Sequence, residues 1–168
     1  GADTLTGGIG TDTVSYSNAA SGLTVSLANT GLNTGDAVGD VYTGIENLTG
    51  SGLNDTLYGD GNGNAIDGGA GKDTIDFSTS AVAVEVYLDG RISRGGDAEG
   101  DTYANIEVLS GSEFDDRLAG GTGAQTINGA TCAFCPVPAG RRPSTLRPCF
   151  LSCTIEMRAA RLAPLHSM

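Results

Sequence analysis

Carboxylate residues recur at a fixed place within short glycine-rich stretches of this sequence. Each stretch has nine residues, with glycine first, aspartate or asparagine sixth, and an aliphatic residue eighth. Three lie in a row in residues 50–76, reading GSGLNDTLY, GDGNGNAID and GGAGKDTID. Residues 1–131 contain neither His nor Cys, which Zn²⁺ and Cu²⁺ would favour, whereas Ca²⁺ accepts six to eight oxygens, backbone carbonyls included. The pattern therefore indicates a hard cation among the turns rather than paired acid–base catalysis.

The nine-residue period predicts the backbone that carries these carboxylates. It fits neither an amphipathic helix nor an alternating strand, and it divides into a six-residue turn and a three-residue strand. Glycine permits the tight turn because it tolerates positive φ. Two nonapeptides would form one turn of a coil, with a strand on each side. The eighth residues would then stack into a narrow apolar core, formed by Leu5, Val14, Leu48, Leu57, Ile66, Ile75, Leu109, Leu118 and Ile127.

A tandem duplication encloses these repeats. A shift of 61 residues places residues 7–67 on residues 68–128 without a gap, and 24 of the 61 positions are identical. Each copy contains a spacer, residues 16–44 and 77–105, in which apolar and polar residues alternate as in a strand. The first residues match the end of a nonapeptide, so we expect the sequence to be a piece of a longer protein.

Composition limits the classes of function. The chain has 168 residues and a net charge of −11, and residues 1–131 hold 19 of its 20 acidic residues. This balance argues against nucleic acid as a partner, because phosphate binding requires clustered Lys and Arg. No apolar run reaches the roughly 18 residues that a transmembrane helix needs. HExxH and GxSxG are absent, and we expect this chain not to be an enzyme.

The complete pattern GGxGxDxUx at residues 7–15 and 68–76, with GDAVGD, IENL and GS after it, resembles the RTX (repeats-in-toxin, hemolysin-type) repeats of secreted bacterial proteins. The resemblance implies an all-β fold, a parallel β-roll, with several Ca²⁺ ions between its turns. It also implies a secreted, extracellular module that folds on binding Ca²⁺. Such a module would be the C-terminal part of a larger protein that uses a type I secretion apparatus.

Two alternatives to this function remain open. One is a metal-independent structural or adhesive β-solenoid, in which the aspartates are solvated residues that favour turns. The other is the non-catalytic end of a secreted hydrolase or epimerase, whose active domain would lie elsewhere in a longer protein.

The resemblance assigns the ligands to sixth-position side chains and glycine-loop carbonyls. Loops on one edge of a roll come from every second nonapeptide, so we expect Asp55 and Asp73 to form the best site, while Asn64 faces Glu46. The predicted metal-binding residues are Asp3, Gly8, Gly10, Asp12, Gly50, Asp55, Asn64, Gly69, Gly71, Asp73 and Asp116. Paired acids of the spacers predict either further Ca²⁺ sites or capped turns, at Asp36, Asp40, Asp97 and Asp101.

Residues 132–168 differ in character from the rest of the chain. They hold every Cys and Pro, and the nine-residue period stops just before them. The spacing C-x2-C-x13-C-x3-C of Cys132, Cys135, Cys149 and Cys153 fits a zinc site or two disulfides. The abrupt change favours a third interpretation, a disordered or non-native, frame-shifted tail. This tail also does not resemble the C-terminal export signal that the family resemblance would imply.

Overall fold

The computed structural model describes residues 1–129 and the backbone of residues 154–156. Residues 154–156 form a strand that pairs with residues 117–119 of the repeat region, and the rest of the tail predicted to be disordered or non-native lies outside the described residues. The zinc and disulfide hypotheses concern cysteines that lie outside the described residues. Among the described residues, no helix is long and apolar enough to cross a membrane.

Short parallel strands dominate the described chain. Each has three residues, which is the length left when a nonapeptide uses six residues for its turn. Single turns of 3-10 helix occur in the spacers, as η1 (Thr30–Leu32), η2 (Gly35–Ala37) and η3 (Gly96–Ala98). The strands are β1 (Thr4–Thr6), β2 (Thr13–Ser15), β3 (Thr24–Ser26), β4 (Val41–Thr43), β5 (Asn47–Thr49), β6 (Thr56–Tyr58), β7 (Ala65–Asp67), β8 (Thr74–Asp76), β9 (Glu85–Tyr87), β10 (Thr102–Ala104), β11 (Val108–Ser110), β12 (Arg117–Ala119), β13 (Thr126–Asn128) and β14 (Thr154–Glu156).

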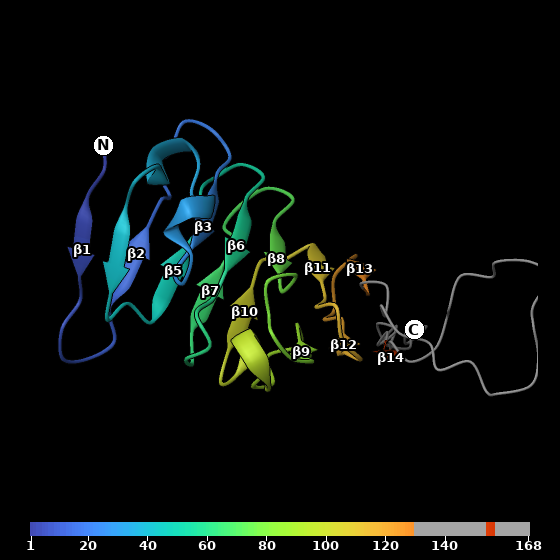
Figure 1. Ribbon diagram of the computed structural model, residues 1–168. Coiled ribbons are helices and arrows are strands. Elements are labelled where there is room, and N and C mark those ends of the chain that lie inside the picture. Colours follow the sequence, from blue (N-terminus) through green and yellow to red (C-terminus); the bar gives the residue numbers. More distant parts are fainter. Residues whose placement is uncertain (130–153, 157–168) are drawn as a thin grey trace, which may run out of the picture.

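The strands stack one beside the next along an elongated molecule, from β1 at one end to β13 near the other (Figure 1). A four-stranded sheet has the order β10-β7-β5-β2, and a five-stranded sheet has the order β13-β11-β8-β6-β3. Two smaller sheets, β1-β4 and β14-β12-β9, complete the architecture, and all of the sheet pairings are parallel. This arrangement is the parallel β-roll that the resemblance to RTX repeats implies.

The two copies of the duplication form corresponding strand pairs. A 61-residue shift converts the pair β2–β5 into β8–β11, and the pair β5–β7 into β11–β13. The pairs β2–β5 and β5–β7 of the first copy lie in the four-stranded sheet, whereas the pairs β8–β11 and β11–β13 of the second copy lie in the five-stranded sheet. Equivalent segments of the two copies therefore occupy different sheets of the roll.

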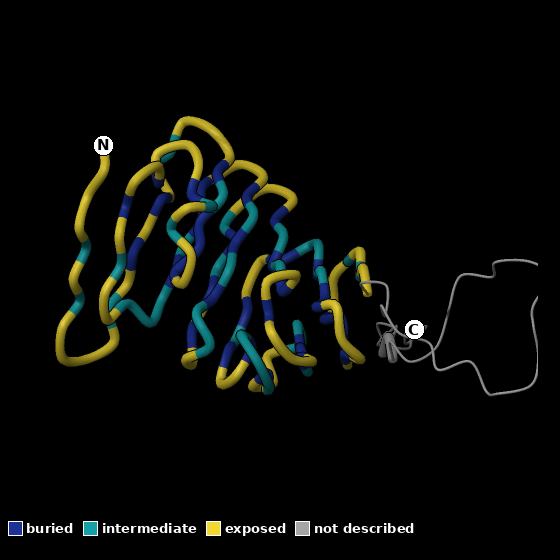
Figure 2. The backbone as a smooth tube through the Cα atoms, viewed as in Figure 1, coloured by how far each residue is buried: buried dark blue, intermediate teal, exposed yellow. Residues whose placement is uncertain are grey.

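The buried apolar residues form one core cluster, and Figure 2 shows buried backbone segments recurring along the length of the roll. The middle residue of nearly every strand points inward, and Leu48, Leu57 and Ile75 are fully buried. Leu5 and Ile127, in strands near the two ends of the described roll, are only partly buried. The spacer strands β3 and β9 extend the core with Val25 and Val86. The expected apolar ladder is therefore present.

Candidate metal centre

The sixth residue of a nonapeptide lies just before the strand, where its carboxylate reaches a neighbouring turn. Asp55 N–H donates to Asp73 Oδ1 at 2.8 Å, and Leu23 N–H donates to Asp55 Oδ1 at 2.9 Å. Asp73 N–H in turn donates to Glu107 Oε2 at 2.9 Å. These bonds form a ladder across four turns of the roll, and they bring Asp55 and Asp73 together as the sequence predicts.

Equivalent bonds recur along the roll because the module is duplicated. In each, a backbone N–H donates to a carboxylate of a neighbouring turn at 2.8 or 2.9 Å. The pairs are Asp12 with Glu46, Asp3 with Asp40, Asn64 with Asp101, and Val84 with Asp116. Asn64 also lies beside Glu46, as expected, since its Nδ2 donates to the Glu46 carbonyl at 3.3 Å.

Two carboxylate oxygens of the ladder have no hydrogen-bond donor. Asp12 Oδ2 and Asp73 Oδ2 are buried and unpartnered, and Asp73 is fully buried as a residue. A buried polar atom without a partner costs about 1–3 kcal/mol, and more when it is charged. The two aspartates occupy equivalent positions in the two copies, so the same feature occurs twice.

A glycine lies beside each unpartnered oxygen. A Cβ at Gly68 would lie 2.7 Å from Asp73 Oδ2 and 2.2 Å from the Asn105 carbonyl oxygen. At Gly7, a Cβ would lie 2.7 Å from Asp12 Oδ2 and 1.9 Å from a second carbonyl oxygen, that of Gly44. A carboxylate oxygen and a carbonyl oxygen therefore converge on the space that a side chain would fill, and both are ligand types that Ca²⁺ accepts.

The bend that supplies the Asn105 carbonyl is held in an unusual conformation. Asn105 has φ +52°, and no other described non-glycine residue has a positive φ. Its Nδ2 donates to Asp67 Oδ1 at 2.7 Å, which fixes the bend against β7. The equivalent position in the first copy is Gly44, with φ +61°. The same backbone turn is thus retained in both copies.

Other predicted ligands are satisfied by the protein itself. Asp55 accepts Ser51 N–H at 2.5 Å and Ser51 Oγ–H at 2.9 Å, in addition to Leu23 N–H. Asp116 has the same relation to Ser112, at 2.7 and 2.5 Å. In both residues the carboxylate thus serves to hold its own loop and the neighbouring turn.

The four aspartates predicted in the spacers differ in how far they are buried. Asp40 and Asp101 are buried, and each accepts a tyrosine hydroxyl, from Tyr16 at 2.6 Å and from Tyr103 at 2.9 Å. Asp36 is exposed in η2, and Asp97 lies in η3. Each also accepts a backbone N–H from a turn 37 residues earlier, Asp40 from Asp3 and Asp101 from Asn64, so these carboxylates link neighbouring turns of the roll.

Burial raises two of the acid pKa values. It raises the pKa of Asp73 to about 6, and the nearby charges of Asp55 and Glu107 add to the effect. It raises the pKa of Asp101 to about 7, with further contributions from the charges of Asp60 and Asp97. A bound cation would act in the opposite direction, because it favours the ionised form.

Several residues around these positions are absent from the set predicted as ligands. Glu107 and Ser51 are examples, and each recurs 61 residues away, as Glu46 and Ser112. That recurrence is the signal that could have identified them. No group of three or more His, Cys, Asp or Glu side chains gathers in the described part of the chain, so any cation there must rely on backbone carbonyls.

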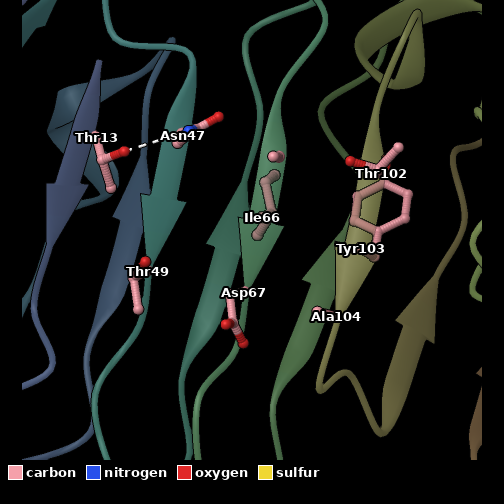
Figure 3. Close-up of a pocket in the computed structure, with 9 residues that line it drawn as sticks. Thr13, Asn47, Thr49, Ile66, Asp67, Thr102, Tyr103 and Ala104 are labelled. Atoms are coloured by element: carbon pink, nitrogen blue, oxygen red, sulfur yellow. Dashed lines mark hydrogen bonds between the residues drawn. The ribbon is translucent and has the colours of Figure 1, made fainter. Parts of the chain in front are cut away.

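A shallow depression lies away from these loops, on the outer face of the four-stranded sheet (Figure 3). It encloses about 340 Å³, and small side chains such as Thr13, Thr49 and Thr102 line it. Thr13 accepts a hydrogen bond from Asn47 Nδ2 at 3.2 Å. Asp67 is the one acidic residue that lines the depression, so the depression brings together no pair of carboxylates for acid–base catalysis.

Stacked three-residue strands with carboxylate-bearing glycine turns define a parallel β-roll of the calcium-binding type. The chain belongs to the RTX calcium-binding nonapeptide repeat family, whose model, with four repeats, matches residues 1–18, 42–76 and 101–131. No curated protein and no solved structure matches the chain. The described repeats are therefore a structural, non-catalytic calcium-binding module.

Proposed function

We propose that this chain is a module that folds, or completes its folding, when Ca²⁺ binds outside the cell. The observation that supports it is the unpartnered Oδ2 of Asp73, buried beside the Asn105 carbonyl, with an equivalent arrangement at Asp12. A cation there would supply the missing partner. Glycine and bend carbonyls give irregular oxygen geometry, which suits Ca²⁺ better than the near-ideal octahedron that Mg²⁺ requires.

The coupling between calcium and folding follows from linkage. An ion that binds only the folded chain stabilises it by RT ln(1 + [L]/Kd). Extracellular calcium modules have Kd values of about 10⁻⁴–10⁻³ M, so a few millimolar Ca²⁺ contributes about 1–2 kcal/mol per ion. Several ions acting together would give a cooperative transition. The stacked carboxylates add to the effect because their mutual repulsion falls when a cation lies among them.

The cellular setting belongs to the same proposal. An RTX repeat module suits a C-terminal position in a larger secreted protein that a type I apparatus exports. The chain would remain unfolded where calcium is scarce and fold where it is plentiful. Any catalytic activity would belong to another part of such a protein.

One observation favours a second candidate, a metal-independent β-solenoid. Asp55 and Asp116 are each satisfied by a serine of the same loop, without a cation. If every loop behaved in this way, the roll would need no metal. The two candidates therefore differ in how much of the fold survives a chelator.

A far-UV circular dichroism titration of the full chain tests the proposal. Protein stripped with EDTA would be titrated with CaCl₂, with MgCl₂ as the control. A cooperative gain of strand signal near millimolar Ca²⁺, absent with Mg²⁺, is the expected result. A stripped protein that is already fully folded would establish the metal-independent solenoid instead, and a stripped protein that stays unfolded in Ca²⁺ would refute the proposal.

A further inference from the structure

Asn-Gly dipeptides occur twice in the sequence, at Asn62–Gly63 and at Asn128–Gly129. Such a step is chemically weak, because the backbone nitrogen of the glycine can attack the side-chain carbonyl carbon of the asparagine. Glycine has no Cβ to hinder this attack, and it lets the backbone reach the required conformation. Whether the attack takes place in a folded chain depends on how the structure holds the peptide unit between the two residues.

The peptide unit between Asn62 and Gly63 lies in the loop between β6 and β7, where both residues are exposed. No described residue accepts a hydrogen bond from Gly63 N–H, and none donates one to the Asn62 carbonyl. The side chain of Asn62 is held within the loop, since its Nδ2 and its backbone N–H each donate to the Asp60 carboxylate at 3.0 Å. The attacking nitrogen is therefore free while the amide that it would attack stays close to the backbone.

The second Asn-Gly step is held in a sheet. Asn128 is the last residue of β13, and an extended backbone keeps the next nitrogen away from the side chain. The Asn128 carbonyl accepts Gly111 N–H at 2.9 Å, and this bond fixes the peptide plane that also contains Gly129 N. The same dipeptide is thus restrained at one place in the roll and lacks this restraint at the other.

We propose that Asn62 is a site of spontaneous deamidation in the folded chain, whereas Asn128 is protected. Gly63 N forms a bond to Asn62 Cγ, its proton passes to the departing Nδ2, which leaves as ammonia, and a cyclic succinimide remains. Water then opens the ring and gives an aspartyl or an isoaspartyl residue at position 62. The reaction consumes water, releases ammonia and involves no oxidation or reduction. It does not depend on the proposed calcium binding.

Either product changes the contacts of the loop. An aspartyl side chain replaces the Nδ2 donor with an oxygen that faces Asp60 Oδ2, so a hydrogen bond becomes a repulsion between like charges. An isoaspartyl residue also lengthens the backbone between Asp60 and Asn64, which are joined by a 3.1 Å bond from Asp60 N–H to Asn64 Oδ1. Asn64 links the loop to the next turn, because its N–H donates to the buried Asp101 Oδ1 at 2.8 Å. The modified chain should therefore be less stable than the fresh chain.

Peptide mapping of the full chain by mass spectrometry tests the inference. The chain would be incubated in Ca²⁺ at mildly alkaline pH, which favours the attack because it promotes loss of the amide proton, and sampled over days. A parallel sample in urea provides the unfolded reference, in which both Asn-Gly steps should deamidate alike. Labelling with protein isoaspartyl methyltransferase reports the isoaspartyl product, and thermal melts compare the aged chain with the fresh one.

Matched variants separate the reaction from general damage to a loop. In Gly63→Ala the new Cβ would lie 3.4 Å from the Gly100 carbonyl oxygen, a van der Waals contact, and Gly63 has no positive φ. Gly52→Ala is the control, since no atom lies within 4 Å of a Cβ built there and Gly52 also lacks a positive φ. Asn62→Gln keeps an amide at the position but disfavours ring closure, because the ring would be one atom larger.

The inference predicts deamidation at Asn62 but not at Asn128 in the folded chain. The modification at position 62 should be lost in Gly63→Ala and in Asn62→Gln, and retained in Gly52→Ala. The inference is overturned if Asn62 stays intact in Ca²⁺, or if Asn128 reacts there as fast as Asn62. Should Gly63→Ala fail to fold, the comparison of the two asparagines in the parent chain decides the question alone. Equal Tm values for aged and fresh chains would refute the expected effect on stability.

Discussion

Replacing Asp73 with Asn should change stability in opposite ways with and without calcium. The amide oxygen would still accept Asp55 N–H, which now lies 2.8 Å from Asp73 Oδ1. The amide nitrogen would take the place of the unpartnered Oδ2, where the Asn105 carbonyl lies across Gly68 as an acceptor. Asp73→Asn therefore removes a buried orphan oxygen in the metal-free chain and an ion ligand in the calcium-bound chain.

The sizes of the two effects can be worked out separately. Relief of an unsatisfied buried oxygen stabilises the metal-free fold by about 1–3 kcal/mol. Loss of one ion lowers the calcium-dependent gain in the free energy of unfolding by about 1–2 kcal/mol at a few millimolar Ca²⁺. For a roll of this size, 1 kcal/mol corresponds to a shift in Tm of about 4 °C. The variant should therefore be more folded than the parent in EDTA and gain less from Ca²⁺.

Thermal melts followed by circular dichroism, in EDTA and in 5 mM Ca²⁺ (a few millimolar, as for extracellular modules), measure both effects. Asp55→Asn is the control, because three donors face that carboxylate and its loss should destabilise the fold equally in both conditions. Equal calcium-dependent gains in Asp73→Asn and the parent would refute the assignment of an ion to Asp73. A lower folded fraction of Asp73→Asn in EDTA would refute the reasoning about its unpartnered oxygen.

Three further predictions concern pH, the core and a buried hydroxyl. The pKa values of about 6 for Asp73 and about 7 for Asp101 lie above the usual carboxyl value, so the folded chain binds more protons than the unfolded one. Thermal melts in EDTA should therefore show higher stability at pH 5 than at pH 7.5. Leu57→Ala, at a fully buried position, should lower the free energy of unfolding by about 2–5 kcal/mol in urea titrations with Ca²⁺. Tyr16→Phe removes the donor 2.6 Å from Asp40 Oδ2 and should cost about 1–3 kcal/mol in the same titration.

Each of these three predictions has its own control and its own contrary result. A Tm in EDTA that is lower at pH 5 than at pH 7.5 would contradict the direction of both pKa shifts. Leu53, an exposed loop residue, provides the alanine control for Leu57, and a similar loss from both would show that the strand-centre ladder is not the core. Tyr58→Phe is the hydroxyl control, because Tyr58 bonds Asp76 at 3.2 Å in a half-buried position. An equal effect of both tyrosine variants would mean that burial of Asp40 does not matter.

The repeat pattern predicted the fold in detail because its two parts have independent physical causes. Glycines restrict where the chain turns, and one aliphatic residue in nine restricts which face is buried. Val14, Leu48 and Ile66 consequently align across adjacent strands, as their shared place in the repeat requires. Sequence spacing alone was also enough to bring Asp55 next to Asp73, because loops two nonapeptides apart lie on one edge.

The sequence predicted where the aspartates lie more readily than it predicted which of their oxygens are free to bind a cation. Asp55, Asp73 and Asp116 share the sixth place in a repeat, yet only Asp73 keeps a buried oxygen without a donor. The difference depends on the direction of one N–H in each loop, and the repeat pattern does not encode direction. The contribution of Glu107 was missed for a related reason, since it lies outside any nonapeptide and meets Asp73 from the next turn.

The sequence by itself determined the periodic features of this protein: the three-residue strands, the apolar ladder, the duplication and the hard-cation chemistry of its turns. Each depends on residue type at a regular spacing, which a linear chain displays directly. The tertiary structure decided which carboxylates the protein satisfies and which it leaves open. That outcome depends on the φ of Gly8 and Gly69 and on bends brought over them from 34 to 37 residues further along the chain. Such contacts exist only once the turns have stacked.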